Sequence, residues 1–119
     1  MNKPPQDVLL HHLRGAILAE VRADEDITLR QLAVVLAVYL SDEPQTVGSL
    51  AEHLDVGKPA ITRALDRLSG LDLVQRTANP ADGRSVLAQR TPAGSVMMER
   101  LKASMAETTQ LLGRLRSPP

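Results

Sequence analysis

The sequence has 119 residues, of which 43% are hydrophobic and 24% are charged, a balance typical of one soluble globular domain. It contains no Cys, Phe or Trp, which excludes disulfides, zinc–thiolate sites and the aromatic platforms that stack single-stranded bases. No apolar run reaches the roughly 18 residues of a membrane span, and residues 1–6 lack the apolar core of a signal peptide. We therefore expect a cytoplasmic protein without a membrane partner.

The net charge is zero, but the charge is unevenly distributed along the chain. Residues 1–56 carry four Lys/Arg and nine Asp/Glu, whereas residues 57–90 carry six Lys/Arg and three Asp. Residues 91–119 carry four Lys/Arg and two Glu. Because a local basic surface matters more for nucleic-acid binding than the total charge, the middle segment is the expected place for one.

Two helices are expected in the first forty residues. Within residues 8–22, apolar side chains recur at helical spacing at Leu9, Leu10, Leu13, Ile17 and Val21. The acidic run 24–26 ends this helix and starts a loop. Thr28 and Gln31 then match a capping box for a helix that reaches about Leu40. Because that helix is apolar on most sides, we expect it to be central and buried.

Two short helices joined by a tight turn are expected next. Thr46 can cap the first, over Val47–Leu54. The second is predicted over Pro59–Ser69, with Pro59 in the first turn, where its missing N–H costs nothing. One face of this helix is apolar. The opposite face is polar and carries Lys58, Thr62, Arg63, Asp66 and Arg67.

Strand-like alternation appears only after these helices. Leu73–Thr77 and Ser85–Arg90 are predicted to form an antiparallel hairpin with a long tip, because Asn-Pro and Asp-Gly lie between them. Thr91 can cap the last helix, which is predicted over Pro92–Arg116. Its apolar stripe consists of Leu101, Met105, Thr108, Leu112 and Leu115.

This order of elements predicts a mainly α fold with a small antiparallel β hairpin, a winged helix-turn-helix. The DNA-binding domain is expected over residues 24–91. The flanking helices, in residues 1–23 and 92–119, are expected to form a homodimer. In this architecture the second helix of the pair enters the major groove, and the hairpin reaches toward the backbone or the minor groove.

The residue types on the second helix and on the hairpin suit double-stranded DNA. Lys58 lies at the positive end of the helix dipole and adds to the attraction for a phosphate. Thr62 and Arg63 follow where side chains reach base edges, whereas Arg67 lies one turn further, near a phosphate. Arg84, at the hairpin tip, suits a narrow minor groove. The predicted DNA-binding residues are Lys58, Pro59, Thr62, Arg63, Arg67, Asp82 and Arg84.

Three stretches resemble the MarR (multiple antibiotic resistance regulator) family. Ile61–Leu68 is similar to the family's recognition helix, and Leu73–Arg76 is similar to the stretch that follows it. Residues 82–94 resemble the wing signature of Asp-x-Arg, five residues, a hydrophobic residue, Thr, two residues and Gly. The resemblance implies that Asp82 pairs with Arg84 and aims it into the minor groove. It also implies a homodimeric repressor that a small phenolic or lipophilic effector releases from DNA. A two-fold dimer would place its two recognition helices in successive major grooves, which predicts a pseudo-palindromic operator.

Two residues depart from the family pattern. Arg90 stands where the wing has a hydrophobic residue, so either only its aliphatic stem packs there or the base of the wing is altered. Asp72 stands where the family has Gly after the recognition helix. Asp tolerates a left-handed conformation better than most residues do.

Other interpretations of the same residues stay open. Lys58, Arg63 and Arg67 can form an ordinary solvated face, Arg84 can be a plain turn residue, and Asp66 can pair with either neighbouring arginine. The alternative function is a winged helix that binds proteins and not DNA. The three histidines show no metal-ligand pattern, and nothing places a nucleophile beside a base. We therefore expect no metal, no cofactor and no enzyme activity.

Overall fold

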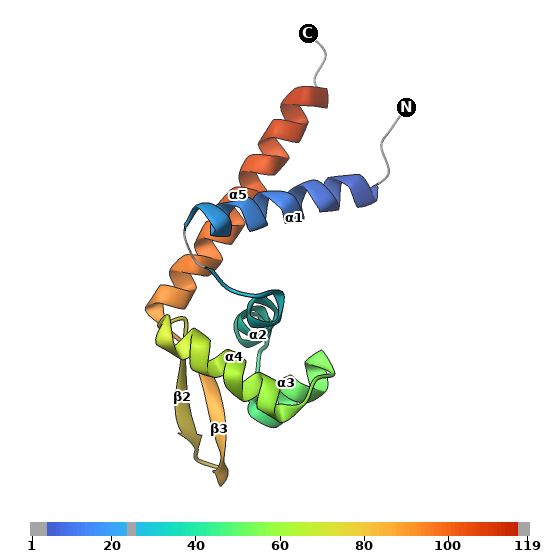
Figure 1. Ribbon diagram of the computed structural model, residues 1–119. Coiled ribbons are helices and arrows are strands. Elements are labelled where there is room, and N and C mark those ends of the chain that lie inside the picture. The colour runs from blue at the N-terminus through green and yellow to red at the C-terminus, as the bar shows by residue number, and fades with distance from the viewer. Residues whose placement is uncertain (1–4, 24–25, 117–119) are drawn as a thin grey trace. The chain divides into compact units, whose positions relative to one another are not determined.

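The computed structural model describes residues 5–23 and 26–116, and side chains over 7–23 and 26–114. Its elements are α1 (Pro5–Arg22), α2 (Leu29–Leu40), β1 (Gln45–Thr46), α3 (Val47–Leu54), α4 (Lys58–Gly70), β2 (Val74–Asn79), β3 (Asp82–Arg90) and α5 (Pro92–Arg116) (Figure 1). They form two compact units: residues 27–97, and the described parts of 1–26 and 98–119. Two expected features, the acidic loop at residues 24–25 and the packing of Leu115, lie outside the described residues.

The helix starts follow from local capping. Thr28 Oγ1 accepts the N–H of Gln31 at 3.1 Å, and Gln31 Oε1 accepts the N–H of Thr28 at 2.9 Å. This confirms the predicted capping box of α2. Thr46 and Thr91 likewise accept backbone N–H groups in the first turns of α3 and α5. Each threonine satisfies a donor that a helix start leaves without a partner.

The turn between α3 and α4 is one residue shorter than predicted. α3 covers the predicted range, but α4 begins at Lys58 and not at Pro59, so the turn consists of Asp55, Val56 and Gly57. Asp55 has φ 56°, a left-handed conformation that lets its N–H bond back to carbonyls of α3. This turn sets the angle between the two helices.

The sheet has three strands in the order β1-β3-β2, with both neighbouring pairs antiparallel. The predicted long hairpin tip is wrong, because β2 runs to Asn79 and β3 starts at Asp82. Asn79 Oδ1 accepts the N–H of Ala81 at 3.0 Å and closes the short turn. Gly83, expected in the turn, lies within β3. β1 was not predicted, since two residues are too short to show alternation.

The core of the 27–97 unit is aliphatic. Its largest fully buried side chains come from α2, α3, α4, the start of β2 with the residue before it, and the start of α5: Val34, Val35, Leu50, Ile61, Leu65, Leu68, Leu73, Val74 and Met97. α2 is buried on one face only, because Leu29 is 80% exposed and Leu40 is 76% exposed. The expectation that α2 is central and buried therefore holds at Val34, Val35, Val38 and Tyr39 and is wrong at both ends of the helix.

The other unit pairs α1 with residues 98–116 of α5. Glu20, 5% exposed, accepts two hydrogen bonds from Arg100, at 2.9 and 2.7 Å. The helices approach closely, since a Cβ at Gly15 would lie 2.5 Å from Thr108 Oγ1. The apolar residues predicted on α1 are nonetheless exposed in this chain: Leu9, Leu10, Leu13, Ile17 and Val21. No described helix is both long and apolar enough to cross a membrane.

Candidate nucleic-acid interface

α4 separates its apolar and polar residues onto opposite faces. The buried face consists of Ile61, Ala64, Leu65 and Leu68. Each α4 residue predicted to bind DNA is exposed: Lys58, Pro59, Thr62, Arg63 and Arg67. Because the apolar face anchors the helix on the core, the polar face is presented to the solvent.

The N-terminus of α4 is suited to an anion. Gly57 is the N-cap and has no side chain to accept the first N–H groups. Pro59 stands in the first turn and contributes no N–H there. Lys58 adds a positive charge beside the positive end of the helix dipole. A phosphate at this end gains both attractions.

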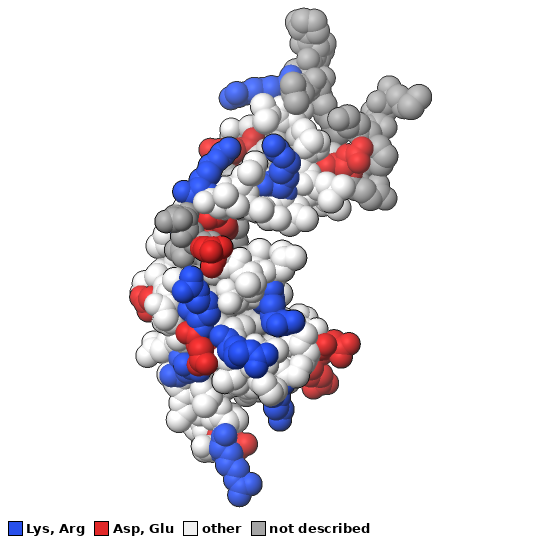
Figure 2. Space-filling model, in the orientation of Figure 1, with Lys and Arg blue, Asp and Glu red and all other residues white. Residues whose placement is uncertain are grey.

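Three of the predicted cations have no acidic partner in the part of the chain that the structure describes. Among the described side chains, Lys58, Arg63 and Arg84 form no ion pair. Figure 2 shows Lys and Arg side chains over α4 and at the free end of the β2–β3 hairpin, with acidic side chains among them. One face of the 27–97 unit therefore offers positive charge from both elements.

The wing tip is ordered by side-chain hydrogen bonds. Asp82 Oδ1 accepts the backbone N–H of Arg84 at 3.0 Å. Ser85 Oγ donates to the Asp82 carbonyl at 3.2 Å and accepts from Asn79 Nδ2 at 2.8 Å. Asp82 thus holds the backbone of Arg84, and among the described side chains it forms no ion pair with the Arg84 guanidinium. The roles of Asn79 and Ser85 were not predicted, because they depend on β2 and β3 extending to the hairpin tip.

An ion pair that was not expected joins α4 to the wing. Arg76 Nη1, on β2, lies 2.6 Å from Asp66 Oδ1. The predicted partners of Asp66 were only its helix neighbours Arg63 and Arg67. Strand alternation carries a usable signal, because Arg76 lies two residues after the buried Val74 and so shares its face of β2.

The two departures from the family pattern have clear structural roles. Asp72 adopts φ 61°, as its left-handed position requires. Arg90 donates from Nε to the Val38 carbonyl at 3.4 Å and from Nη2 to the Ser41 carbonyl at 2.9 Å. Its guanidinium also lies 5.8 Å from the centre of the Tyr39 ring. Arg90 therefore binds the C-terminal end of α2, and the base of the wing is altered.

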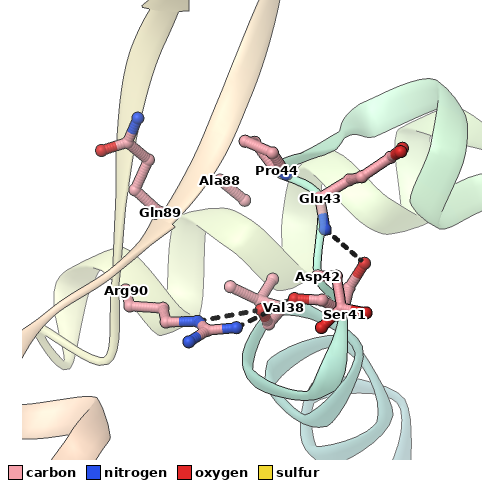
Figure 3. A pocket seen from close by; sticks show the side chains of 8 residues that line it. All are labelled: Val38, Ser41, Asp42, Glu43, Pro44, Ala88, Gln89 and Arg90. Carbon is pink, nitrogen blue, oxygen red and sulfur yellow. Dashed lines mark hydrogen bonds between the residues drawn. The ribbon is translucent and has the colours of Figure 1, made fainter.

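Arg90 also borders a pocket of about 360 Å³ between the end of α2 and β3 (Figure 3). The Arg90 side chain points toward Val38 and Ser41 on one side of this pocket. Asp42 and Glu43 line it as well. The pocket is therefore lined by two carboxylates and by one cation, Arg90, which already donates to the carbonyls of Val38 and Ser41.

A buried hydroxyl connects α2 to the base of the wing. Tyr39 Oη donates to the Leu73 carbonyl at 2.7 Å and accepts the N–H of Thr91 at 2.9 Å. Thr91 Oγ1 in turn donates to the Asp72 carbonyl at 2.7 Å. These bonds hold the end of β3 against the segment that leaves α4. The wing is thereby tied to the helix beside it.

The exposed groups of this surface are suited to binding an anionic partner. The described residues contain no group of three or more His, Asp or Glu side chains placed to hold a metal ion. What the surface offers is exposed cations, a helix N-terminus and hydroxyl groups. Groups of these kinds form most of the contacts that proteins make to DNA phosphates.

Comparison with known proteins places these features in a family. A model of the MarR family matches residues 25–85. The multiple antibiotic resistance protein MarR of Salmonella typhimurium is 30% identical over 92 residues, which cover 77% of this chain and 63% of that protein. An uncharacterized HTH-type transcriptional regulator of Mycobacterium leprae, ML2140, is 28% identical over 81 residues, 68% of this chain and 56% of the relative. The matches span less than two thirds of either relative.

Solved structures share the fold. The transcriptional regulator Tm0710 from Thermotoga maritima gives a TM-score of 0.77 at 23% identity, over 98% of this chain and 83% of that one. A mutant of S. aureus MepR bound to an oligodeoxyribonucleotide gives 0.80 at 20% identity, over 94% and 80%. These likenesses confirm the winged-helix fold, and the relatives named as regulators are not enzymes.

Proposed function

Because the chain belongs to the MarR family, we propose that it is a transcriptional regulator that binds double-stranded DNA as a homodimer. The observation that carries this proposal is the exposed polar face of α4, with Arg63 and Lys58 unpaired among the described residues. A structural neighbour, MepR, is bound to an oligodeoxyribonucleotide in its own structure. Since the matched relatives are bacterial regulators, the cytoplasm is the proposed place of action.

In the proposed complex α4 lies in the major groove. Thr62 and Arg63 face base edges, where an arginine reads guanine through two hydrogen bonds. Lys58 and the N-terminus of α4 bind a phosphate, and Arg67 binds another. Pro59 fixes the conformation of the first turn of α4, which lies close to the DNA backbone in this complex. Arg84 enters the minor groove from the wing tip that Asp82 orders.

The exposed apolar residues of α1 support the homodimer. Leu9, Leu10 and Leu13 are 66%, 61% and 50% exposed. On α5, Met105 is 40% exposed and Leu111 is 56% exposed. Apolar patches of this kind mark association surfaces, since their burial removes them from water. A two-fold dimer places two α4 helices in successive major grooves about 34–36 Å apart on a pseudo-palindromic operator.

Repression and effector control are the finer parts of the proposal. A dimer seated on its operator blocks access to the DNA beneath it, which favours a repressor. A small phenolic or lipophilic effector is expected from the family alone. Its test is a compound that raises the melting temperature and releases DNA together.

The experiment measures binding of the full chain to a fluorescent random-sequence duplex and to an operator selected from random duplexes, over a range of salt concentrations. We expect Lys58→Ala to weaken both complexes alike and to reduce the salt slope by about 2 per dimer, since each lost phosphate contact changes it by about 0.9. Arg84→Ala should weaken the operator complex. The control is Lys102→Ala, an exposed lysine on α5.

The outcomes separate the two candidate functions. Salt-dependent binding that Lys58→Ala reduces and Lys102→Ala leaves unchanged supports the DNA-binding regulator. Binding of neither duplex at any salt concentration overturns it and favours the protein-interaction module, for which the zero net charge already argues. An Arg84→Ala variant with unchanged operator affinity removes the wing from the interface.

A further inference from the structure

The exposed face of α4 carries one carboxylate among its cations. Asp66 follows Thr62 by four residues and Arg63 by three, so it lies on the same face of the helix as both. Its side chain is 57% exposed. A carboxylate on a face presented to phosphates repels them, so Asp66 alone would weaken DNA binding.

Asp66 has a cationic partner on the wing. Arg76 reaches from β2, and its Nη1 lies 2.6 Å from Asp66 Oδ1. Arg76 is 35% exposed, so the pair is open to solvent. Exposed ion pairs contribute little to folding stability, because water screens them and two long side chains lose freedom. A purely stabilising role therefore accounts poorly for this pair.

Arg76 is well placed to contact DNA when it is unpaired. It shares the face of β2 with the buried Val74, which packs toward the core, and its guanidinium ends beside the exposed face of α4. An arginine at this position can reach a phosphate of a duplex lying along α4. In the structure that guanidinium is instead paired with the Asp66 carboxylate, whose negative charge offsets its positive charge.

We propose that Asp66 is a positioning residue that holds Arg76 against α4 and limits the sequence-independent attraction of this surface for DNA. The inference rests on the proposed function. In this arrangement the pair acts as one neutral unit within a cationic surface. The remaining cations, Lys58 and Arg63 among them, then supply the contacts to the duplex.

The test uses the full chain and a fluorescent 30-base-pair duplex of random sequence, titrated at several salt concentrations. We expect Asp66→Asn to bind this duplex roughly three- to tenfold more tightly at 0.1 M salt, because Arg76 becomes free for one phosphate in each protomer. The salt slope should steepen by about 2 per dimer. Arg76→Gln should bind more weakly than wild type, since it leaves the carboxylate unpaired. Asp66→Glu should restore wild-type binding.

The matched control is Glu99→Gln. Glu99 forms an exposed ion pair with Lys102 on α5, at 3.2 Å, so the substitution makes the same change in charge and also breaks an exposed pair. We expect it to leave the salt slope unchanged. Far-UV circular dichroism confirms that each variant is folded.

Each outcome decides the matter. Unchanged or weaker binding by Asp66→Asn, with normal binding by the wild type, overturns this inference and leaves the proposed function standing. Equal tightening by Glu99→Gln overturns it too, because net charge then explains the effect. A wild-type chain that binds no duplex overturns the proposed function and this inference with it.

Discussion

The hydroxyl of Tyr39 occupies the space into which a side chain at Gly94 would project. A Cβ built on Gly94 overlaps that hydroxyl and the carbonyl oxygen of Leu73. The hydroxyl cannot move away without losing its bonds to Leu73 and to the N–H of Thr91. Gly94 has no positive φ. This glycine is therefore required by the close approach of α5 to Tyr39 and not by its own backbone conformation.

Gly94→Ala should lower the free energy of unfolding by about 2–3 kcal/mol, the upper range for overpacking a filled core. Urea denaturation at fixed pH measures the loss. The matched control is Gly70→Ala at the end of α4, where an added Cβ meets nothing within 4 Å. Because Ala is the better helix former, this control should be neutral or slightly stabilising. Equal losses in the two variants would contradict the overlap with Tyr39.

Arg90 should stabilise the fold through its hydrogen bonds and not only through its charge. Arg90→Ala removes the bonds to the carbonyls of Val38 and Ser41, for which we expect a loss of about 1 kcal/mol in the free energy of unfolding. Arg90→Lys keeps a cation near the C-terminal end of α2 but loses the planar guanidinium. Its free energy of unfolding should therefore lie between those of the wild type and Arg90→Ala. Thermal and urea unfolding give the order.

Arg90→Leu compares the Arg90 hydrogen bonds with the packing of the hydrophobic residue that the family's wing signature has at this position. If Arg90→Leu unfolds at the same urea concentration as the wild type or a higher one, the packing of Leu offsets whatever the two hydrogen bonds contribute. A loss similar to that of Arg90→Ala supports them.

The close approach of α1 and α5 predicts that Gly15→Ala changes the free energy of unfolding in opposite directions with and without the Thr108 side chain. A Cβ added at Gly15 would lie 2.5 Å from Thr108 Oγ1, so Gly15→Ala should destabilise the chain by about 1–3 kcal/mol. In a Thr108→Ala background that overlap is absent, and Gly15→Ala should stabilise by up to about 1 kcal/mol, the helix-propensity gain. Urea unfolding of the four chains measures the coupling. Additive effects would place the helices further apart than the structure does.

The features that sequence analysis predicted best depend on neighbouring residues. Thr28 and Gln31 meet across a single helical turn, and the caps at Thr46 and Thr91 are equally local. The bounds of α2, α3 and α5 followed from such signals. The left-handed Asp72 was anticipated from the family pattern and from the tolerance of Asp for that conformation.

The features that were missed depend on contacts between distant segments. Arg90 meets Ser41 across 49 residues and Asp66 meets Arg76 across the α4–β2 junction. Periodicity assigns a face to a residue but does not say which residue from another element lies opposite it. For the same reason the wing signature identified Gly94 without revealing that Tyr39 excludes any larger side chain.

The candidate interface was predicted residue by residue from α4 and the wing, and the structure exposes all seven residues. Their contacts with DNA stay a prediction. What the structure adds is the way in which the wing tip is held. Asn79 binds Ser85, and Ser85 binds the carbonyl of Asp82. These contacts could not be predicted from the sequence, because they require β2 to reach residue 79 and β3 to begin at residue 82.

The bond between Asp82 and the backbone N–H of Arg84 predicts opposite results for two substitutions at the same residue. Asp82→Ala removes the acceptor, so the tip loosens, and operator affinity should fall about fivefold, equivalent to one hydrogen bond of about 1 kcal/mol. Asp82→Asn keeps an Oδ1 acceptor and removes a negative charge near the DNA, and it should therefore bind as tightly as the wild type or more tightly. Fluorescence anisotropy with a selected operator measures both, and unfolding curves confirm that both variants are equally folded. If Asp82→Asn binds as weakly as Asp82→Ala, the carboxylate acts through its charge on the Arg84 guanidinium, as the family resemblance implies, and the backbone bond is not what positions the wing.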